Sequence, residues 1–565
     1  MKQLLLLLIV VLISSGAVIA ADSGPITMRT GQNITLSDTS YINVGSNNYT
    51  LSTDRINQSQ GFTGLGASTM AGAFDFNGNT LTDAKIGNSL PFVTVGPYDW
   101  CDYQTDHNVD ETEINAALVD SGYVILCGDF EISDPILLIS DRTLDGYNAT
   151  ITLADGANCN GIYTGSGYSY KNITVKNIYL DGNKENQTTY SKGIYLHGVT
   201  DGRVENCEVI NANTSGIYAA NSVDITFEDC EVSYTGHTSG ISTVGIQFEN
   251  VTDGYIIGND VHDTACFGIY VYLSTNYIVR GNSVDNVTKK IGVDDAGYGI
   301  QNFNGDVNGI ICENFVNDTE GLGIGSYGDI DWEYLNYNMT IRDNKIHYTN
   351  DYGIFVSKTV GYCVDGNTIN NAGTDGDACR GIYSDSAGPG YIRSNHVNLT
   401  GGSYGHGIQC INGTGLIVDG NNVINAGQGP SGANADGINI YSTFNSTIAN
   451  NIISNSKRRD ITEQTNSDYN IFIGNHLKSA TTWSKNGANT VFRHNLGYRT
   501  EAWGATSVAD GGTITHTLGT TPTGVVITPT LSGTIVAATA KGSTTFTVGF
   551  SGTTTTQTVY WYAWV

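Results

Sequence analysis

The fold of this chain is decided by a unit that begins Gly193-Ile194-Tyr195 and continues, fourteen residues after its glycine, with Cys207-Glu208-Val209. The unit restarts every 23 to 31 residues, at Gly193, Gly216, Gly245, Gly268, Gly299, Gly323, Gly353, Gly381, Gly407 and Gly437. In eight of the ten units a Cys or Asn stands 14 residues after the glycine, namely Cys207, Cys230, Asn259, Asn282, Asn367, Asn395, Asn421 and Asn451. Such a near-regular period predicts a solenoid.

Each unit carries three short strands. After the glycine, Ile194 and Leu196 point one way and Tyr195 the other, as side chains alternate in a strand. Short apolar stretches before and after the fourteenth position give two more strands, and no window shows a helical 3.6-residue period across a repeat. A repeated asparagine suits a tight turn, because it tolerates the left-handed conformation and its amide can bond its equivalents on neighbouring coils. These features predict a parallel β-helix with one buried aliphatic column per strand.

Composition narrows the classes of function. Of the 565 residues, 70 are glycine and only 14% are charged, which favours β structure over helix or disorder. The net charge of −28 argues against nucleic acid as a partner, since no basic stripe could neutralise phosphates.

The first 21 residues have the pattern of a secretory signal peptide. A lysine is followed by an apolar run from Leu4 to Ile13 and by small residues up to Ala21. The run is too short to span a bilayer, and no later stretch is long and apolar enough for a transmembrane anchor. We therefore expect the protein to be secreted, extracellular or at the cell surface.

The expected fold class is all-β, with five segments. These are the signal peptide at 1–21, an N-terminal β-rich region at 22–95, a helix-capped start of the solenoid at 96–158, the parallel β-helix at 159–503 and a small β-sandwich module at 504–565. The cap helix is expected at 110–118 with Asp110 as its N-cap. The aromatic run at 560–564 is expected to pack the core of the sandwich, and the alternative is that it binds sugar.

The ten cysteines permit disulfides. Cys207 and Cys230 hold equivalent positions on successive coils, about 5 Å apart, so either a disulfide or two stacked buried thiols is open.

The repeats resemble those of the right-handed parallel β-helix proteins of the pectate-lyase-like superfamily, over about residues 110–500. The segment from Asp110 to Gly146, with its Gly128-Asp129-Phe130 turn, resembles the start of the polysaccharide-degrading and phage-tailspike members. The resemblance implies a polysaccharide partner but no particular activity, since the superfamily includes lyases, hydrolases, epimerases and non-catalytic surface proteins. The tailspike resemblance also implies a homotrimer. The last segment resembles β modules that end phage tail fibres and some glycan-binding proteins.

The outward face of the Gly-Ile strand is the expected binding surface. Insertions enter each unit at one corner, beside this strand, and loops on a rigid scaffold often carry function. The outward column is Tyr195, Tyr218, Gln247, Tyr270, Gln301, Phe355, Tyr383, Gln409 and Asn439. Rings and amides about 5 Å apart suit a glycan chain, although aromatic ladders also stabilise sheets by themselves. A second candidate sugar contact is Asp331 with Trp332, in an insertion between Gly323 and Asn344.

Candidate catalytic residues gather where three long loops precede Gly381, Gly407 and Gly437. Triplets on successive coils resemble motifs of the polygalacturonase-like hydrolases: Asn350-Asp351-Tyr352, Gly376-Asp377-Ala378 and Gly405-His406-Gly407. Asn350 and Asp351 are adjacent rather than one residue apart, and Ala378 stands where that family has a second aspartate. Asp351 and Asp377 would be the two carboxylates of a hydrolase. The other candidates are His406, Arg380, Lys358 and Asp385.

Two further arginines have a simpler interpretation. Arg342 and Arg393 alternate with Asp365 and Asp419 in one column, which predicts a solvated ion-pair ladder rather than a lyase site. No cofactor is required by the sequence. Clustered aspartates could hold Ca²⁺, but no loop has a recognised calcium spacing, so no metal ligands are assigned.

The sequence thus predicts an exported β-helix protein that binds a polysaccharide along the Gly-Ile strand face. A non-catalytic adhesion or surface role is favoured. The alternative is a polysaccharide-degrading enzyme, either a glycoside hydrolase or a uronate lyase, that acts in the same groove.

Overall fold

A computed structural model gives two compact units, Met1–Phe92 and Val93–Val565. The residues that the structure describes are short strands between 17 and 88, then 92–106, 110–167, 169–236, 243–289, 297–328, 334–373, 379–402, 404–428, 434–479, 483–497, 501–518, 521–530, 535–551 and 555–565. In these residues no helix is long and apolar enough to cross a membrane.

The first unit contains four antiparallel strand pairs within its described residues. The pairs are β1 (Ala17–Ala20) with β2 (Thr27–Thr30), β3 (Ser40–Val44) with β4 (Asn47–Leu51), β5 (Ala67–Thr69) with β8 (Lys85–Asn88), and β6 (Phe74–Phe76) with β7 (Asn79–Leu81).

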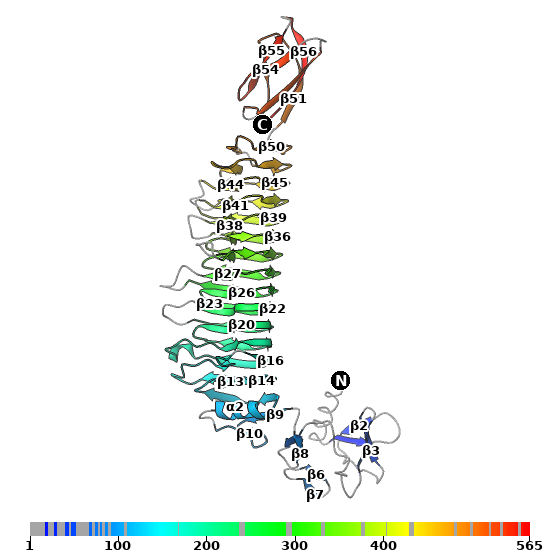
Figure 1. Ribbon diagram of the computed structural model, residues 1–565, viewed down its shortest axis with the longest axis vertical. Helices are drawn as coiled ribbons and strands as arrows, with labels where there is room; N and C mark the ends of the chain where they lie inside the picture. The colour runs from blue at the N-terminus through cyan, green and yellow to red at the C-terminus, as the bar shows by residue number, and fades with distance from the viewer. Residues whose placement is uncertain are drawn as a thin grey trace. The chain divides into compact units, whose positions relative to one another are not determined.

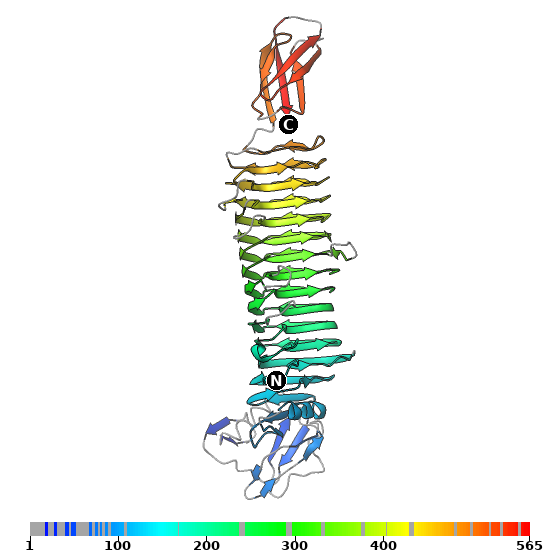
Figure 2. The same ribbon diagram turned by 90° about the vertical axis from the view of Figure 1, so that its left-hand side faces the viewer.

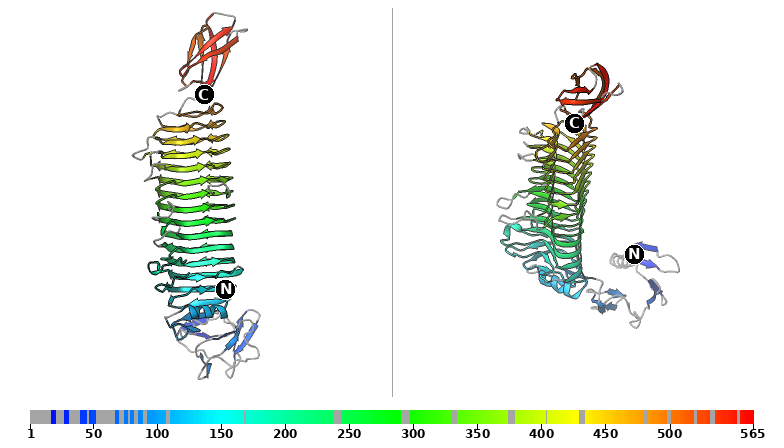
Figure 3. Two further views of the ribbon diagram at one scale, coloured as in Figure 1. Left: turned by 60° about the vertical axis from the view of Figure 1, so that its left-hand side comes forward. Right: turned by 45° about the horizontal axis from the view of Figure 1, so that its top comes forward.

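The second unit begins with a parallel β-helix, whose coils stack from β9 (Val93–Gly96) to β50 (Val491–Arg493) (Figures 2 and 3). Along the Gly-Ile side the strands are β13 (Ile136–Leu137), β15 (Ile162–Tyr163), β17 (Ile194–His197), β20 (Ser215–Glu228), β22 (Val244–Ile257), β24 (Phe267–Tyr272), β27 (Tyr298–Phe303), β30 (Ile324–Tyr327), β34 (Ile354–Ser357), β38 (Arg380–Asp385), β41 (His406–Ile411), β44 (Asp436–Tyr441) and β47 (Arg459–Glu463). β20 and β22 continue around a corner onto the second side.

The second side is completed by β11 (Tyr123–Leu126), β14 (Arg142–Leu153), β16 (Tyr170–Asp181), β18 (Val199–Glu205), β25 (Ile278–Arg280), β28 (Ile310–Cys312), β32 (Thr340–Arg342), β36 (Tyr362–Asp365), β39 (Gly390–Arg393), β42 (Ile417–Asp419), β45 (Thr447–Ala449), β48 (Ile471–Ile473) and β50. The third side follows the Asn corner and contains β12 (Asp129–Ile132), β19 (Glu208–Ile210), β21 (Glu231–Ser233), β23 (Asp260–Ala265), β26 (Ser283–Thr288), β29 (Phe315–Thr319), β33 (Lys345–Thr349), β37 (Thr368–Ala372), β40 (His396–Thr400), β43 (Asn422–Ile424), β46 (Ile452–Ser454) and β49 (His476–Leu477). Short accessory strands are β10 (Tyr103–Gln104), β31 (Asn336–Tyr337) and β35 (Thr359–Val360).

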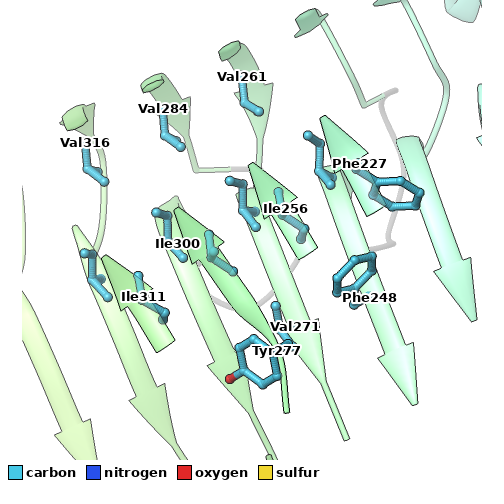
Figure 4. Close-up of a cluster of buried hydrophobic side chains, with 14 of the residues drawn as sticks. Phe227, Phe248, Ile256, Val261, Val271, Tyr277, Val284, Ile300, Ile311 and Val316 are labelled. Carbon is cyan, nitrogen blue, oxygen red and sulfur yellow. The ribbon is translucent and has the colours of Figure 1, made fainter. Parts of the chain in front are cut away.

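The interior is built from the buried columns that the repeat predicts. Figure 4 shows Val261, Val284 and Val316 of the third side in line, one per coil. Ile256 and Ile311 of the second side lie opposite them, and all five side chains are fully buried. Burial of this kind stabilises each coil by about 1.5–3 kcal/mol per aliphatic side chain relative to exposure.

The repeated glycine is explained by lack of space, not by its backbone angles. A Cβ on Gly268 would lie 2.4 Å from Cγ1 of Val284 and 2.7 Å from the carbonyl oxygen of Gly299. Equivalent close approaches occur at Gly193, Gly245 and Gly381. The glycine therefore lets the buried Val or Ile of the third side pack against the backbone of the Gly-Ile strand.

The Asn corner is a continuous ladder of buried amides. Asn314 Oδ1 accepts both the backbone N–H and the side-chain N–H of Asn282, at 2.9 Å each. Asn314 Nδ2 in turn donates to the carbonyl of Val279 and to Asn344 Oδ1. The ladder extends beyond the predicted units to Asn475 and Asn495.

The expected left-handed asparagine was placed one residue too late. The residue with positive φ is the one before each ladder position, such as Gly281 (φ 66°) before Asn282 and Glu313 (φ 58°) before Asn314. The turn is made there, and the asparagine that follows is free to point inward and bond the next coil.

The helix α2 (Glu111–Asp120) lies at the start of the solenoid and buries Ile114, Ala117 and Leu118. Asp110 precedes it but makes no side-chain cap, so the predicted N-cap role is wrong. Its buried carboxylate accepts the backbone N–H of Glu131 at 2.9 Å, and thus fixes the helix to β12.

The ten cysteines are free thiols in the structure. Cys207 and Cys230 are buried on adjacent coils, and burial raises the pKa of Cys207 well above its usual value. Of the two alternatives for this pair, the structure has the stacked thiols.

The C-terminal module is a sandwich of two three-stranded antiparallel sheets. One sheet is β51 (Glu501–Val508), β56 (Gln557–Trp564) and β53 (Gly524–Pro529), and the other is β52 (Thr513–Thr515), β55 (Thr545–Ser551) and β54 (Ile535–Lys541), drawn in orange to red in Figure 1. Its core contains Ile514, Phe546, Val548 and Trp561.

Candidate functional site

Strand register places the predicted outward residues of the Gly-Ile strand in one column. Each residue of the column pairs with its equivalent on the next coil, from Tyr163 through Asn439. The order is Tyr163, Tyr195, Tyr218, Gln247, Tyr270, Gln301, Gly325, Phe355, Tyr383, Gln409 and Asn439. Gly325 interrupts the column, and Tyr163 extends it by one coil.

The aromatic rings of this column stack on one another. Tyr163 and Tyr195 have centroids 5.0 Å apart, Tyr195 and Tyr218 4.7 Å, and Phe355 and Tyr383 5.2 Å, all with nearly parallel planes. Most of their flat faces are therefore covered by their neighbours, and the edges and hydroxyl groups point outward. The column offers hydrogen bonds and ring edges rather than open stacking platforms.

A second outward column escaped the sequence-based reasoning. It is the residue directly before each repeat glycine, paired in register where Arg380 lies beside His406 and Asp436 beside Arg459. This column includes Lys192, Tyr352, Arg380, His406 and Asp436. A sequence signal was available, because charged or aromatic residues recur at that one position of the unit.

The first cationic position of the face is Lys192. Its Nζ lies 4.8 Å from the ring centroid of Tyr195 and 4.9 Å from that of Tyr218. Burial lowers the pKa of Lys192, and the charge of Glu249 opposes that shift. The Tyr218 hydroxyl donates to the Glu249 carboxylate, and burial together with this bond raises the pKa of Tyr218.

The second cationic position is Arg380. Its guanidinium lies 4.6 Å from the ring centroid of Tyr383 and 5.3 Å from that of Tyr352. It donates to Gln409 Oε1 and to the Tyr352 hydroxyl. Both cations of the face thus lie over tyrosine pairs, where cation–π attraction adds to stacking.

Polar groups continue from Gln409 into the buried end of the face. Gln409 Nε2 donates to Asn439 Oδ1 at 3.0 Å, and Asn439 Nδ2 donates to the Asp436 carboxylate at 2.7 Å. Arg458 Nε donates to the same carboxylate at 2.8 Å. Asp436 and Asn439 are fully buried, so this end of the face is closed by its own side chains.

His406 belongs to this closed end. Its Nδ1 accepts the backbone N–H of Asp436 at 2.9 Å, which assigns the proton of the neutral ring to Nε2. Burial, together with the charges of Arg380 and Arg458, lowers the pKa of His406 to about 4 against the opposing charge of Asp436. A buried neutral histidine held in this way acts as part of the scaffold.

The remaining predicted catalytic residues lie apart or are engaged. The Asp351 carboxylate is 3.6 Å from Lys289 Nζ. The Asp385 carboxylate accepts hydrogen bonds from Tyr383, Ser386 and Asn412. The backbone N–H of Lys358 donates to the carbonyl of Asp385. Asp377, Asp331 and Trp332 fall outside the described residues.

The arginine and aspartate column on the second side forms ion pairs on the surface. Arg393 binds Asp365 at 3.0 Å, whereas Arg342 binds Asp343 at 2.8 Å, a partner that the sequence-based ladder did not include. Among the residues described, no three His, Cys, Asp or Glu side chains are grouped so that they could hold a metal ion.

Comparison with known proteins identifies the architecture. The family described as right handed beta helix region matches residues 143–284. The solenoid is a right-handed parallel β-helix. No curated protein sequence matches this chain.

Solved structures with the same fold differ strongly in sequence. A single-residue mutant of the tailspike protein of Escherichia coli bacteriophage HK620, in complex with pentasaccharide, is 13% identical, covers 87% of this chain and 97% of its own, and has a TM-score of 0.54. The tailspike gp49 of Pseudomonas phage LKA1 is 12% identical, with coverage of 80% and 92% and a TM-score of 0.45. The A-module of Azotobacter vinelandii mannuronan C-5 epimerase AlgE6 is 13% identical, with coverage of 70% and 97% and a TM-score of 0.39.

Proposed function

We propose that this protein binds an extended polysaccharide along the Gly-Ile strand face without cleaving it. The observation that carries the proposal is the outward column of rings and amides, which runs in unbroken strand register over consecutive coils. Coils repeat about every 4.8 Å, close to the length of one sugar residue. An extended glycan parallel to the stack can therefore meet an equivalent contact at each coil.

The chemistry of the column fits this ligand. Tyr195, Tyr270, Phe355 and Tyr383 are partly exposed at their edges, and the amide of Gln247 lies between them. Tyrosine hydroxyls and amides pair with sugar hydroxyls, while ring edges contact the apolar C–H groups of a pyranose. Lys192 and Arg380 add two cations at fixed positions.

The non-catalytic role is supported by the state of the candidate catalytic groups. His406 is buried and neutral, and Asp436 is buried and bonded to Arg458 and Asn439. The Asp385 carboxylate already accepts three hydrogen bonds. A general acid or base must reach the glycosidic oxygen or a ring proton, which these groups do not do from their present positions.

The use of the same fold by the bacteriophage HK620 tailspike, determined in complex with pentasaccharide, agrees with the proposal. We further propose, from the first 21 residues, that the protein acts outside the cell, and a homotrimer remains the oligomer to test. Mass spectrometry of the exported protein would locate cleavage near Ala21, and light scattering would give the oligomeric mass.

The binding proposal is tested by affinity measurements on a panel of immobilised uronans and neutral glycans. Tyr383→Ala should weaken the best ligand by tenfold or more, because it removes a ring edge and the partner of Arg380. Tyr391→Ala is the control, since Tyr391 is exposed on the second side of the solenoid. Equal affinity of wild type and Tyr383→Ala for every bound glycan would rule out this face.

The enzyme alternative is tested with the same panel. Ultraviolet absorbance reports the unsaturated ends that a lyase forms, and a reducing-end assay reports hydrolysis. Turnover of any glycan that is lost in Asp351→Asn would replace the binding role by a catalytic one. Binding without turnover is the expected result.

A further inference from the structure

The C-terminal module exposes aromatic side chains on the outer face of one sheet. Along β56 the residues alternate: Val559, Trp561 and Ala563 are buried, whereas Tyr560 and Tyr562 face outward. The aromatic run at 560–564 was expected either to pack the core or to bind sugar. The structure divides the run, because only Trp561 enters the core, where it meets Phe546 edge to face.

Neighbouring strands enlarge this surface. Trp503 of β51 lies directly opposite Tyr562, which lies opposite Val526 of β53. Tyr560 stands in the next row, between Ala505 and Thr528. Trp503 is 73% exposed, Tyr560 59% and Val526 52%. We call the set Trp503, Val526, Tyr560 and Tyr562 the aromatic platform.

The strand beneath the end of the platform is shaped for a flat ring. A Cβ on Gly524 would lie 2.0 Å from the indole of Trp564, so the glycine lets that ring lie against the backbone of β53. The Trp564 ring packs against Tyr562 with centroids 5.5 Å apart. This contact supports Tyr562 from one side and holds it in the platform.

The platform differs from the ladder of the solenoid in how its rings are used. In the ladder, successive rings cover one another at about the coil spacing. Trp503 and Tyr560 lie on different strands in different rows and remain more than half exposed. Rings of this kind present apolar area to solvent, and such area marks a binding surface.

The size of the platform does not suit a second copy of the chain. Three strands and three rows span roughly 300 Å² of sheet, from strand spacing and residue rise. A stable protein interface needs about 800 Å² per partner. The chain also carries a net charge of −28, which opposes close approach of another copy.

The surroundings of the platform are neutral and rich in hydroxyl groups. The outward neighbours on the same strands are Ala505, Ser507, Thr528, Thr530 and Thr558. The one charged outward residue of these strands, Glu501, forms a side-chain hydrogen bond with Tyr562. A ligand with a flat apolar face and a hydroxylated edge matches both parts, and a neutral pyranose has that form.

We propose that the aromatic platform is a second glycan-binding site, which takes neutral pyranose residues by stacking on Trp503 and Tyr560. This site is separate from the Gly-Ile face and does not depend on the function proposed for it.

The test titrates the full chain with cellohexaose, maltohexaose, mannohexaose, xylohexaose and chitohexaose, followed by tryptophan fluorescence and calorimetry. At least one hexaose should bind, and Trp503→Ala should weaken it by tenfold or more. Trp503 is too exposed for this change to unfold the module, which circular dichroism would check. Tyr383→Ala should leave the affinity unchanged, so a failure of the face and a failure of the platform are distinguishable.

Three results would overturn the proposal. The first is the absence of binding by any of the five hexaoses at millimolar concentration. The second is an affinity that Trp503→Ala and Tyr560→Ala both leave unchanged. The third is a drop in oligomeric mass in Trp503→Ala, measured by light scattering, because a second copy would then be the occupant.

Discussion

The Asn corner and the Gly-Ile face are both columns of equivalent residues on stacked coils, yet they are built oppositely. The corner repeats one residue, buried, from Asn259 to Asn495, and each amide bonds the next. The face changes residue at nearly every coil and mixes rings, amides and charges. The corner needs the same side chain each time because it must satisfy the same buried backbone groups.

The face is itself divided. Between Tyr195 and Tyr383 its residues are mostly partly exposed, and from Gln409 to Asn439 they are buried. The buried end has taken on the role of the corner, with polar partners fully bonded to one another. An outward position in a strand therefore gives access to a ligand only where no other side chains cover it.

Removal of a corner amide should have the largest effect on stability. Asn314→Ala leaves the Asn282 N–H, the Val279 carbonyl and the Asn344 amide without a buried partner. At about 1–3 kcal/mol for each unsatisfied group, we expect a loss of about 4 kcal/mol, measured by denaturant unfolding. Asn317→Ala is the control on the same coil, since Asn317 is partly exposed and bonds only Asp285 among its printed neighbours' side chains. Equal losses for the two variants would contradict the special role of the corner.

The buried end of the face should be nearly as sensitive. Arg458→Ala leaves the fully buried Asp436 carboxylate without its cation, which should destabilise the fold by about 3 kcal/mol. Arg393→Ala breaks an Arg–Asp pair on the half-exposed second side and should leave the denaturation midpoint within error. A small effect of Arg458→Ala would mean that this end of the face is open to solvent.

The pH dependence of stability should report the same burial through His406. Its folded pKa of about 4 is below the unfolded value of about 6.5, so the unfolded chain binds more protons between these values. Stability from this group is complete above about pH 6.5 and decreases as the pH falls to about 4, by up to about 3 kcal/mol. His406→Asn should flatten this part of the profile. His396→Asn, on the outer surface, is the control, and an unchanged slope in His406→Asn would contradict the assignment.

Two glycines of one coil should separate lack of space from backbone conformation, with the smallest effects. Gly268→Ala introduces a Cβ against Val284 and should cost about 2 kcal/mol by overpacking. Gly281→Ala meets open space but requires a left-handed alanine, at about 1 kcal/mol. If Gly281→Ala proved the more damaging of the pair, the repeat glycine would not be explained by packing.

The sequence by itself determined the solenoid, its buried columns and the position of the Asn ladder, because a residue spaced equally in every unit must stack on its equivalents. It could not determine that the turn residue precedes the asparagine, since Glu313 and Asp343 are not residues that mark a left-handed turn. It also missed Lys192, Tyr352 and Arg458, which act through neighbours 22 to 32 residues away.

Only the tertiary structure decided which outward side chains remain accessible. Tyr195 and Trp503 look alike in an alternating strand, but the ring of Tyr195 is covered by Tyr163 and Tyr218, whereas Trp503 has no such stack. His406 and Tyr383 likewise stand on the same face, one closed and one partly open. Exposure depends on what packs over a side chain from other coils, and the spacing of residues along the chain does not contain that information.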